Sequence, residues 1–211
     1  MLLAARDESV RRIVNASSSS VYGNAGALPK VESQSPDPIS PYAVAKLAAE
    51  RFCTSFSRVY EMEIVSLRYF NVFGPRQDPA SQYAAVVPRF IRAIAAGEPV
   101  TIYGDGEQSR DFTYVDNVVG ANLLAAEAAG VHGEIVNVAT GGSITVNALA
   151  DTVGALLGRT VEKVYEPARE ADVLASWADL DEAKRVLGYE PQVTFEDGLR
   201  RTADHLLDGK E

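Results

Sequence analysis

Tyr42 and Lys46 lie four residues apart in a segment that begins with Ser40-Pro41. On a helix, this spacing places both side chains on one face, one turn apart. Serine is a favoured N-cap and proline suits the first helical position, so the helix start is well defined. A lysine ammonium beside a phenol favours the phenolate, which can remove a proton from an alcohol. The pair predicts a general base, although this spacing alone is more often a solvated helix face.

Small polar side chains precede this helix at the end of a predicted strand. Residues 11–17 (RRIVNAS) are predicted to form a short buried strand that ends in small polar residues, and residues 17–20 are serines. Residues 63–70 form a second predicted strand, which ends next to Asn71. A strand, a long connection with a helix and another strand are typical of a right-handed parallel unit. Open α/β sheets bind ligands at the carboxyl ends of their strands, so these segments are expected to meet at one crevice.

The composition is that of a globular protein with a substantial core. The 211 residues are 46% hydrophobic and 23% charged. A formal net charge of −9 argues against nucleic acid as the main partner. The single Cys53 excludes an internal disulfide framework and zinc clusters of cysteine type. Because no stretch has the pattern of a signal peptide or the length of a membrane span, we expect a cytoplasmic protein without membrane partners.

Periodicity and turn residues predict the remaining elements. The predicted helices cover residues 1–9, 41–60, 86–96, 116–129, 145–157, 180–187 and 195–207. The predicted strands cover residues 11–17, 63–70, 100–103, 133–139 and 161–165. Their mixed order indicates the α/β class.

Five segments, in order along the chain, resemble the extended short-chain dehydrogenase/reductases of the NAD-dependent epimerase/dehydratase group, which act on nucleotide sugars. The segments are residues 16–23 (ASSSSVYG), 40–46 (SPYAVAK), 67–75 (LRYFNVFGP), 104–106 with 109–112 (GDG and SRDF) and 169–172 (READ). The resemblance implies an incomplete, C-terminal part of a Rossmann-type parallel sheet in residues 1–72 and 111–140. It also implies a smaller α/β domain that binds the nucleotide sugar, in residues 73–110 and 141–211.

The resemblance further implies roles for individual residues. Ser18, Tyr42 and Lys46 would be catalytic, and Tyr42, Lys46, Tyr69 and Phe70 would contact NAD. The substrate-binding set would be Ser18, Ser19, Asn71, Ala85, Val86, Tyr103, Arg110, Arg169, Asp172 and Ser176. Tyr103 would stack on the uracil ring, while Arg110 and Arg169 would hold the diphosphate, for which a bidentate guanidinium is suited. Singly, each residue also has an ordinary structural interpretation, and only their joint order favours function.

The residues beside Ser18 distinguish among the reactions of this family. Dehydratases and sugar-acid decarboxylases of the family usually carry acidic residues where this chain has Ser19 and Ser20. The resemblance therefore implies NAD-dependent 4-epimerisation through a 4-keto sugar. Ser176 stands where some glucose/galactose epimerases have tyrosine, and it leaves room for an N-acetyl group. The expected substrates are UDP-GlcNAc and UDP-GalNAc, with UDP-glucose and UDP-galactose as the alternative pair, and the expected assembly is a homodimer.

One departure from the family concerns NAD itself. The family's G-x-x-G-x-x-G turn, which holds the NAD pyrophosphate at a helix N-terminus, does not occur in the 211 residues. We therefore expect a fragment or a truncated gene model, with a naturally short form as the alternative. The strand at residues 13–16 would then lie at an open edge of the sheet. An inactive module that binds a nucleotide sugar remains a further alternative.

Overall fold

The computed structural model describes residues 1–24, 26–78, 86–168 and 173–208. Its central element is a parallel sheet with the strand order β1 (Arg12–Ser18), β2 (Glu63–Tyr69) and β7 (Glu134–Val138). The register pairs Ser17 with Arg68 and Ser18 with Tyr69. The carboxyl ends of β1 and β2 therefore reach the same edge of the sheet. Among the described strands, β1 forms one edge, as the sequence predicts.

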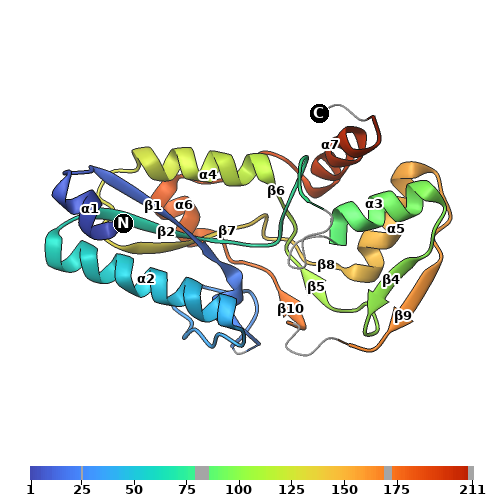
Figure 1. Ribbon diagram of the computed structural model, residues 1–211, viewed down its shortest axis with the longest axis horizontal. Coiled ribbons are helices and arrows are strands. Elements are labelled where there is room, and N and C mark those ends of the chain that lie inside the picture. Colours follow the sequence, from blue (N-terminus) through green and yellow to red (C-terminus); the bar gives the residue numbers. More distant parts are fainter. Residues whose placement is uncertain (25, 79–85, 169–172, 209–211) are drawn as a thin grey trace.

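Helices cover both faces of this sheet (Figure 1). On one face, α2 (Pro41–Tyr60) packs against β1 and β2, and α1 (Leu2–Asp7) packs on α2. On the other face, α4 (Val115–Glu127) and α6 (Asp181–Leu187) share one apolar core with β2 and β7. Strand residues alternate between the two cores, so Ile64 packs on the α2 side and Val65 on the α4 side.

The rest of the chain forms a smaller part beside this sheet (Figure 1). Its helices are α3 (Val86–Ala96), α5 (Val146–Leu157) and α7 (Phe195–Asp208). Its strands are β3 (Val72–Phe73), β4 (Val100–Tyr103), β5 (Ser109–Arg110), β6 (Thr113–Tyr114), β8 (Ile144–Thr145), β9 (Lys163–Glu166) and β10 (Ala175–Ser176). Aromatic rings form the centre of its core: the ring centroids of Phe73 and Phe195 are 5.7 Å apart, and those of Phe112 and Phe195 are 5.8 Å apart.

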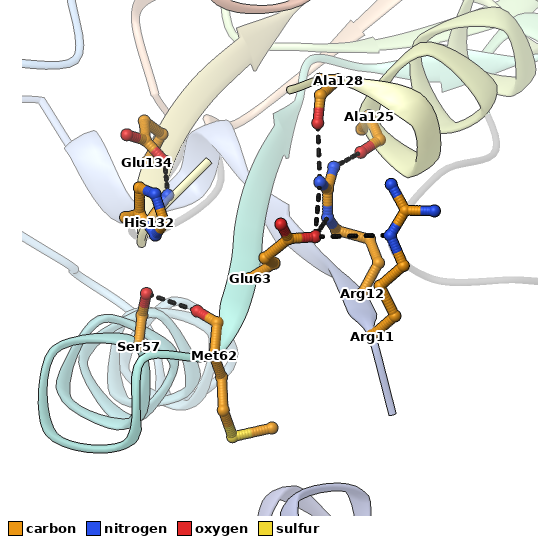
Figure 2. Close-up of polar contacts among 9 residues, drawn as sticks. All are labelled: Arg11, Arg12, Ser57, Met62, Glu63, Ala125, Ala128, His132 and Glu134. Atoms are coloured by element: carbon orange, nitrogen blue, oxygen red, sulfur yellow. Dashed lines mark hydrogen bonds and ion pairs between the residues drawn. The ribbon is translucent and has the colours of Figure 1, made fainter. Parts of the chain in front are cut away.

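Arg12 ties the amino ends of the strands to the end of α4 (Figure 2). Its guanidinium donates hydrogen bonds to the carbonyls of Ala125 at 2.7 Å and Ala128 at 2.6 Å. It also pairs with Glu63 at 2.8 Å. Because the last carbonyls of a helix have no partner within the helix, Arg12 supplies the donors that they lack. This contact fixes the end of the sheet opposite to Ser18.

The α/β class and the long elements agree with the sequence analysis. The helix α2 begins and ends at the predicted residues, and so do α3 and β4. The two-residue strands were not predicted, because two residues carry no periodicity. The sequence analysis places residues 141–211 in the smaller domain, but α6, which lies in this range, packs on β7 and α4 of the central sheet. The reason is that Ala183 and Leu187 fill the core beneath β7. No helix within the described ranges is long and apolar enough to cross a membrane.

Candidate active site

Tyr42 and Lys46 occupy the first turns of α2, as the sequence predicts. The Ser40 side chain accepts a hydrogen bond from the Ala43 N–H at 3.2 Å and so caps the helix. The Lys46 Nζ lies 5.7 Å from the centroid of the Tyr42 ring, within the range of a cation–π attraction. Tyr42 as a whole is 47% exposed. The helix therefore presents a phenol to solvent with a cation beside it.

Lys46 also joins α2 to the strand that carries Ser18. Its Nζ donates a hydrogen bond to the carbonyl of Ala16 at 2.8 Å, two residues before Ser18. An ammonium has three N–H donors. Within the described part of the chain, no residue accepts a hydrogen bond from the other two donors of Lys46. The bond brings the tyrosine helix and the serine segment together and leaves donors for a ligand.

Ser18 ends β1 and caps the 3-10 helix η1 (Ser19–Tyr22). Its Oγ accepts a hydrogen bond from the Ser20 N–H at 3.2 Å. This bond uses a lone pair of the hydroxyl and leaves its hydrogen for a ligand oxygen. Ser19 is partly exposed beside it, and the Ser20 Oγ is buried without a partner among the described residues. Ser18 is thus held in place, and none of the residues that the structure describes accepts its proton.

Three predicted site residues, Tyr69, Phe70 and Asn71, lie at the end of β2 and have different surroundings. The Tyr69 hydroxyl donates a hydrogen bond to Oδ1 of Asn122 at 3.0 Å, on the α4 face of the sheet. Phe70 has no exposed surface and packs in a small cluster with Tyr22. Asn71 has a φ of 21°, a region that strains a non-glycine residue. Tyr69 thus points to the α4 side and Phe70 packs in the interior, and their contacts with NAD stay predictions.

Arg110 and Ser176 lie side by side although they are far apart in the sequence. β5 and β10 pair in parallel, with Arg110 opposite Ser176. The Arg110 Nη1 donates a hydrogen bond to the Ser109 carbonyl at 2.8 Å. Ser176 is 6% exposed. The structure therefore brings together the arginine predicted to hold a diphosphate and the serine predicted to select the sugar.

Asp111 holds these strands, and the sequence analysis gave it no role. Its buried carboxylate accepts hydrogen bonds from the Thr140 N–H at 2.9 Å, the Thr140 hydroxyl at 2.6 Å, the Gly141 N–H at 2.9 Å and the Ala178 N–H at 3.3 Å. Burial raises the pKa of Asp111, and the bonds from Thr140 oppose this shift. An acidic residue directly before the apolar Phe112 is the signal that could have identified it.

The other predicted substrate residues lie in the smaller part or outside the described ranges. Tyr103 ends β4, and its carbonyl accepts a hydrogen bond from the Gln108 side chain at 2.7 Å. Val86 begins α3 and packs against the core of that part. Ala85, Arg169 and Asp172 fall outside the described residues, so their predicted contacts stay predictions.

Comparisons with known proteins agree with this geometry. The model of the NAD dependent epimerase/dehydratase family matches residues 1–139. A UDP-glucuronate 4-epimerase of Thermodesulfobacterium geofontis is 34% identical over 200 residues, which are 94% of this chain and 60% of that protein.

Two solved structures are similar over nearly the whole chain. One is a UDP-N-acetylglucosamine 4-epimerase from Methanobrevibacter ruminantium M1 in complex with UDP-N-acetylmuramic acid, with a TM-score of 0.93 and 40% identity over 99% of this chain and 66% of that one. The other is a UDP-glucose 4-epimerase from Thermotoga maritima with UDP-glucose, with a TM-score of 0.94 and 40% identity over 100% of this chain and 68% of that one. The chain thus spans 60% to 68% of the length of these three proteins.

Proposed function

Because the chain belongs to the NAD dependent epimerase/dehydratase family, we propose that it serves the 4-epimerisation of a UDP-hexose. The proposed substrates are UDP-GlcNAc and UDP-GalNAc. The observation that carries the proposal is the hydrogen bond from Lys46 to Ala16, which joins the tyrosine helix to the serine strand. A phenol, an ammonium and a hydroxyl at one edge of a parallel sheet suit reversible proton transfer at a sugar hydroxyl.

Each member of this set has a distinct task in the proposed reaction. The Tyr42 phenolate accepts the proton of the C4 hydroxyl and returns it when the hydroxyl forms again. Ser18 donates its hydroxyl hydrogen to the same oxygen and stabilises the charge that develops there. The Lys46 ammonium stabilises the phenolate. Bound NAD supplies the reversible oxidation at C4. The 4-keto sugar would turn in the site between the two proton transfers, so that reduction at its other face by the bound cofactor would invert C4 without net redox change.

The described residues fit one end of NAD. The ammonium of Lys46 and the phenol of Tyr42 are of the chemical type that binds the hydroxyl groups of the nicotinamide ribose. They lie at the carboxyl edge of the sheet, where open α/β sheets bind nucleotides. The pyrophosphate needs a glycine-rich turn at a helix N-terminus, which the 211 residues do not contain. Tyr42 and Lys46 would therefore orient the nicotinamide end.

The residues that follow Ser18 support epimerisation rather than dehydration. Ser19 and Ser20 both lie in η1, directly beside Ser18. Loss of a sugar hydroxyl needs a group that can protonate it, and a serine hydroxyl is a poor acid near neutral pH. The described part of η1 therefore offers a hydrogen-bonding site without a general acid.

Ser176 supports an N-acetylated sugar. Its small side chain lies opposite Arg110, next to the proposed diphosphate site. A serine side chain is much smaller than a tyrosine, which is the basis for proposing that this position admits an N-acetyl group. UDP-glucose and UDP-galactose are the alternative pair, since similar solved structures carry the names of epimerases for UDP-N-acetylglucosamine and for UDP-glucose.

Turnover and binding together test the proposed function. The chain is incubated with NAD and UDP-GlcNAc, and the formation of UDP-GalNAc is measured. We expect product formation at a rate that Tyr42→Phe lowers by about 10²-fold or more. The matched control is Tyr60→Phe at the other end of α2, because Tyr60 is 43% exposed and lies far along the helix from Lys46. Separate calorimetric titrations with NAD and UDP-GlcNAc complete the test: binding of the sugar nucleotide alone, without turnover, would identify the inactive binding module instead.

The choice of sugar has its own test at Ser176. Ser176→Tyr should lower turnover of UDP-GlcNAc by roughly tenfold or more, as filling a pocket commonly does, and affect UDP-glucose much less. Position 176 is only 6% exposed, so a larger side chain there strains the surrounding packing. Thermal unfolding therefore serves as the control that the variant is folded. Equal losses on both sugars would contradict the role of Ser176 in selecting the sugar.

The proposed function includes a homodimeric assembly and a cytoplasmic location. The outer face of α2 supports a homodimer, because Val44, Phe52 and Val59 are 52%, 63% and 66% exposed. Sedimentation equilibrium should show a dimer, and a monomer at all concentrations would contradict this assembly. A cytoplasmic location is proposed with it.

A further inference from the structure

A buried ion pair lies behind the segments that meet at the candidate site. Nη2 of Arg68 and Oε2 of Glu50 are 2.7 Å apart, and Arg68 Nε donates to Glu50 Oε1 at 2.8 Å. The exposed fractions of the two side chains are 1% and 0%. Two charges lose their hydration on burial, and their attraction often does no more than offset that loss. Stability alone is therefore a weak explanation for this pair.

The two partners come from the elements that carry the proposed catalytic residues. Glu50 lies on α2, one turn after Lys46 and two turns after Tyr42, on the face that packs against the sheet. Arg68 lies on β2 near its carboxyl end. The pair therefore fixes both the rotation and the height of α2 relative to the edge of the sheet.

A third residue extends the contact to β1. The Ser17 hydroxyl donates a hydrogen bond to Glu50 Oε1, the oxygen that also accepts from Arg68. Ser17 pairs with Arg68 in the register of β1 and β2, so both side chains leave the sheet on the α2 side. Ser17 directly precedes Ser18. One carboxylate on α2 thus holds the strand residue adjacent to Ser18.

Further contacts of Arg68 reach η1 and β7. Its guanidinium carbon lies 4.6 Å from the centroid of the Tyr22 ring. The Tyr22 hydroxyl donates to Oδ1 of Asn137 at 2.7 Å. Burial raises the pKa of Tyr22 to about 12, so the ring stays neutral at working pH. The Arg68 Nη1 is buried without a hydrogen-bond partner among the described residues.

We propose that Glu50, Arg68 and Ser17 form a positioning clamp that sets Lys46 relative to Ser18. The clamp is defined by the three side chains and their hydrogen bonds to the Glu50 carboxylate. None of the three needs to touch the substrate. Their effect on turnover rests on the proposed function, whereas their effect on the Lys46–Ala16 hydrogen bond does not.

The test uses a double variant that removes the charges together. Glu50→Met with Arg68→Met fills similar volume, and replacing a buried ion pair in this way is often neutral or stabilising. The matched control is Arg12→Met with Glu63→Met, which removes the pair that joins β1 to β2 at the opposite end of the sheet (Figure 2). Thermal unfolding of both double variants shows whether each is folded.

The first readout needs neither substrate nor cofactor. The ammonium ¹⁵N resonance of Lys46, identified by its loss in Lys46→Arg, reports the hydrogen bond to the Ala16 carbonyl through slowed proton exchange. We expect the clamp variant to lose this signal and the control variant to keep it. A signal that persists in the folded clamp variant, or disappears in the control as well, would overturn the proposal.

The second readout is the split between kcat and KM. Loss of positioning should lower kcat at least tenfold and leave KM for the UDP-sugar within about twofold, because substrate contacts are intact. A folded clamp variant with wild-type kcat would overturn the proposal. If the wild-type chain shows no turnover, the proposed function fails for this chain, while the Lys46 signal still decides the clamp.

A milder variant covers the case in which the double variant does not fold. Ser17→Ala removes one donor to Glu50 and keeps the ion pair with Arg68. We expect faster proton exchange at the Lys46 ammonium and a several-fold loss of kcat. An unchanged Lys46 signal in Ser17→Ala would overturn the link between the clamp and Ser18.

Discussion

Removing the Asp111 carboxylate should destabilise the junction between the central sheet and the smaller part. In Asp111→Ala, the backbone N–H groups of Thr140, Gly141 and Ala178 lose their acceptor. The Thr140 hydroxyl can rotate toward another acceptor. A buried donor without a partner costs about 1–3 kcal/mol. Taking the lower value for each of these N–H groups gives a loss of about 3 kcal/mol in the free energy of unfolding. Because Arg110 directly precedes Asp111, the affinity for UDP should fall as well.

Urea unfolding at pH 7 measures this loss. With a slope of about 2–3 kcal/mol per molar urea, the midpoint should fall by roughly 1–1.5 M. Asp111→Asn keeps one acceptor oxygen and should lose about half as much free energy. The control is Asp116→Ala, which removes an exposed ion pair with Arg201 and should cost less than about 1 kcal/mol. A loss below about 1 kcal/mol in Asp111→Ala would refute the view that this carboxylate holds the junction.

The remaining predictions concern Ser18 and Glu63. Ser18→Ala should lower kcat by roughly 10²-fold, as loss of one donor to a developing oxyanion does. It should cost about 1 kcal/mol or less of stability, since Oγ caps only the Ser20 N–H; a wild-type kcat would contradict its role. The Arg12 guanidinium lowers the pKa of Glu63, so the stability that Glu63 contributes is present above its unfolded-state pKa and is lost as pH falls through the folded-state pKa. Glu63→Gln should therefore lower the urea midpoint at pH 7, and this loss should shrink as the pH falls through the folded-state pKa of Glu63; a loss that grows on acidification would contradict this sign.

The long elements could be predicted because each carries its own local signal. For α2, Ser40 and Pro41 mark the start and a continuous helical pattern follows. The meeting of Lys46 with the strand of Ser18 was also predictable, since parallel strands align their carboxyl ends. That prediction needed only the order of strand, helix and strand.

Other features depend on tertiary contacts that a linear pattern does not contain. Glu50 has the appearance of a surface residue on an amphipathic helix, and its burial follows only from the pairing of Ser17 with Arg68 across β1 and β2. Asp111 has the same ambiguity, because its donors lie in distant segments. The direction of Tyr69 toward α4 likewise depends on the partner that Asn122 provides.

In the proposed reaction, Tyr42 exchanges a proton with the C4 hydroxyl of a UDP-sugar. The most direct measurement follows UDP-GlcNAc by ¹H NMR in the presence of NAD and either the wild-type chain or Tyr42→Phe. We expect an equilibrium mixture with UDP-GalNAc for the wild type, and a rate lower by about 10²-fold or more for Tyr42→Phe with unchanged affinity for UDP-GlcNAc. A Tyr42→Phe variant that interconverts the two sugars at the wild-type rate would contradict it.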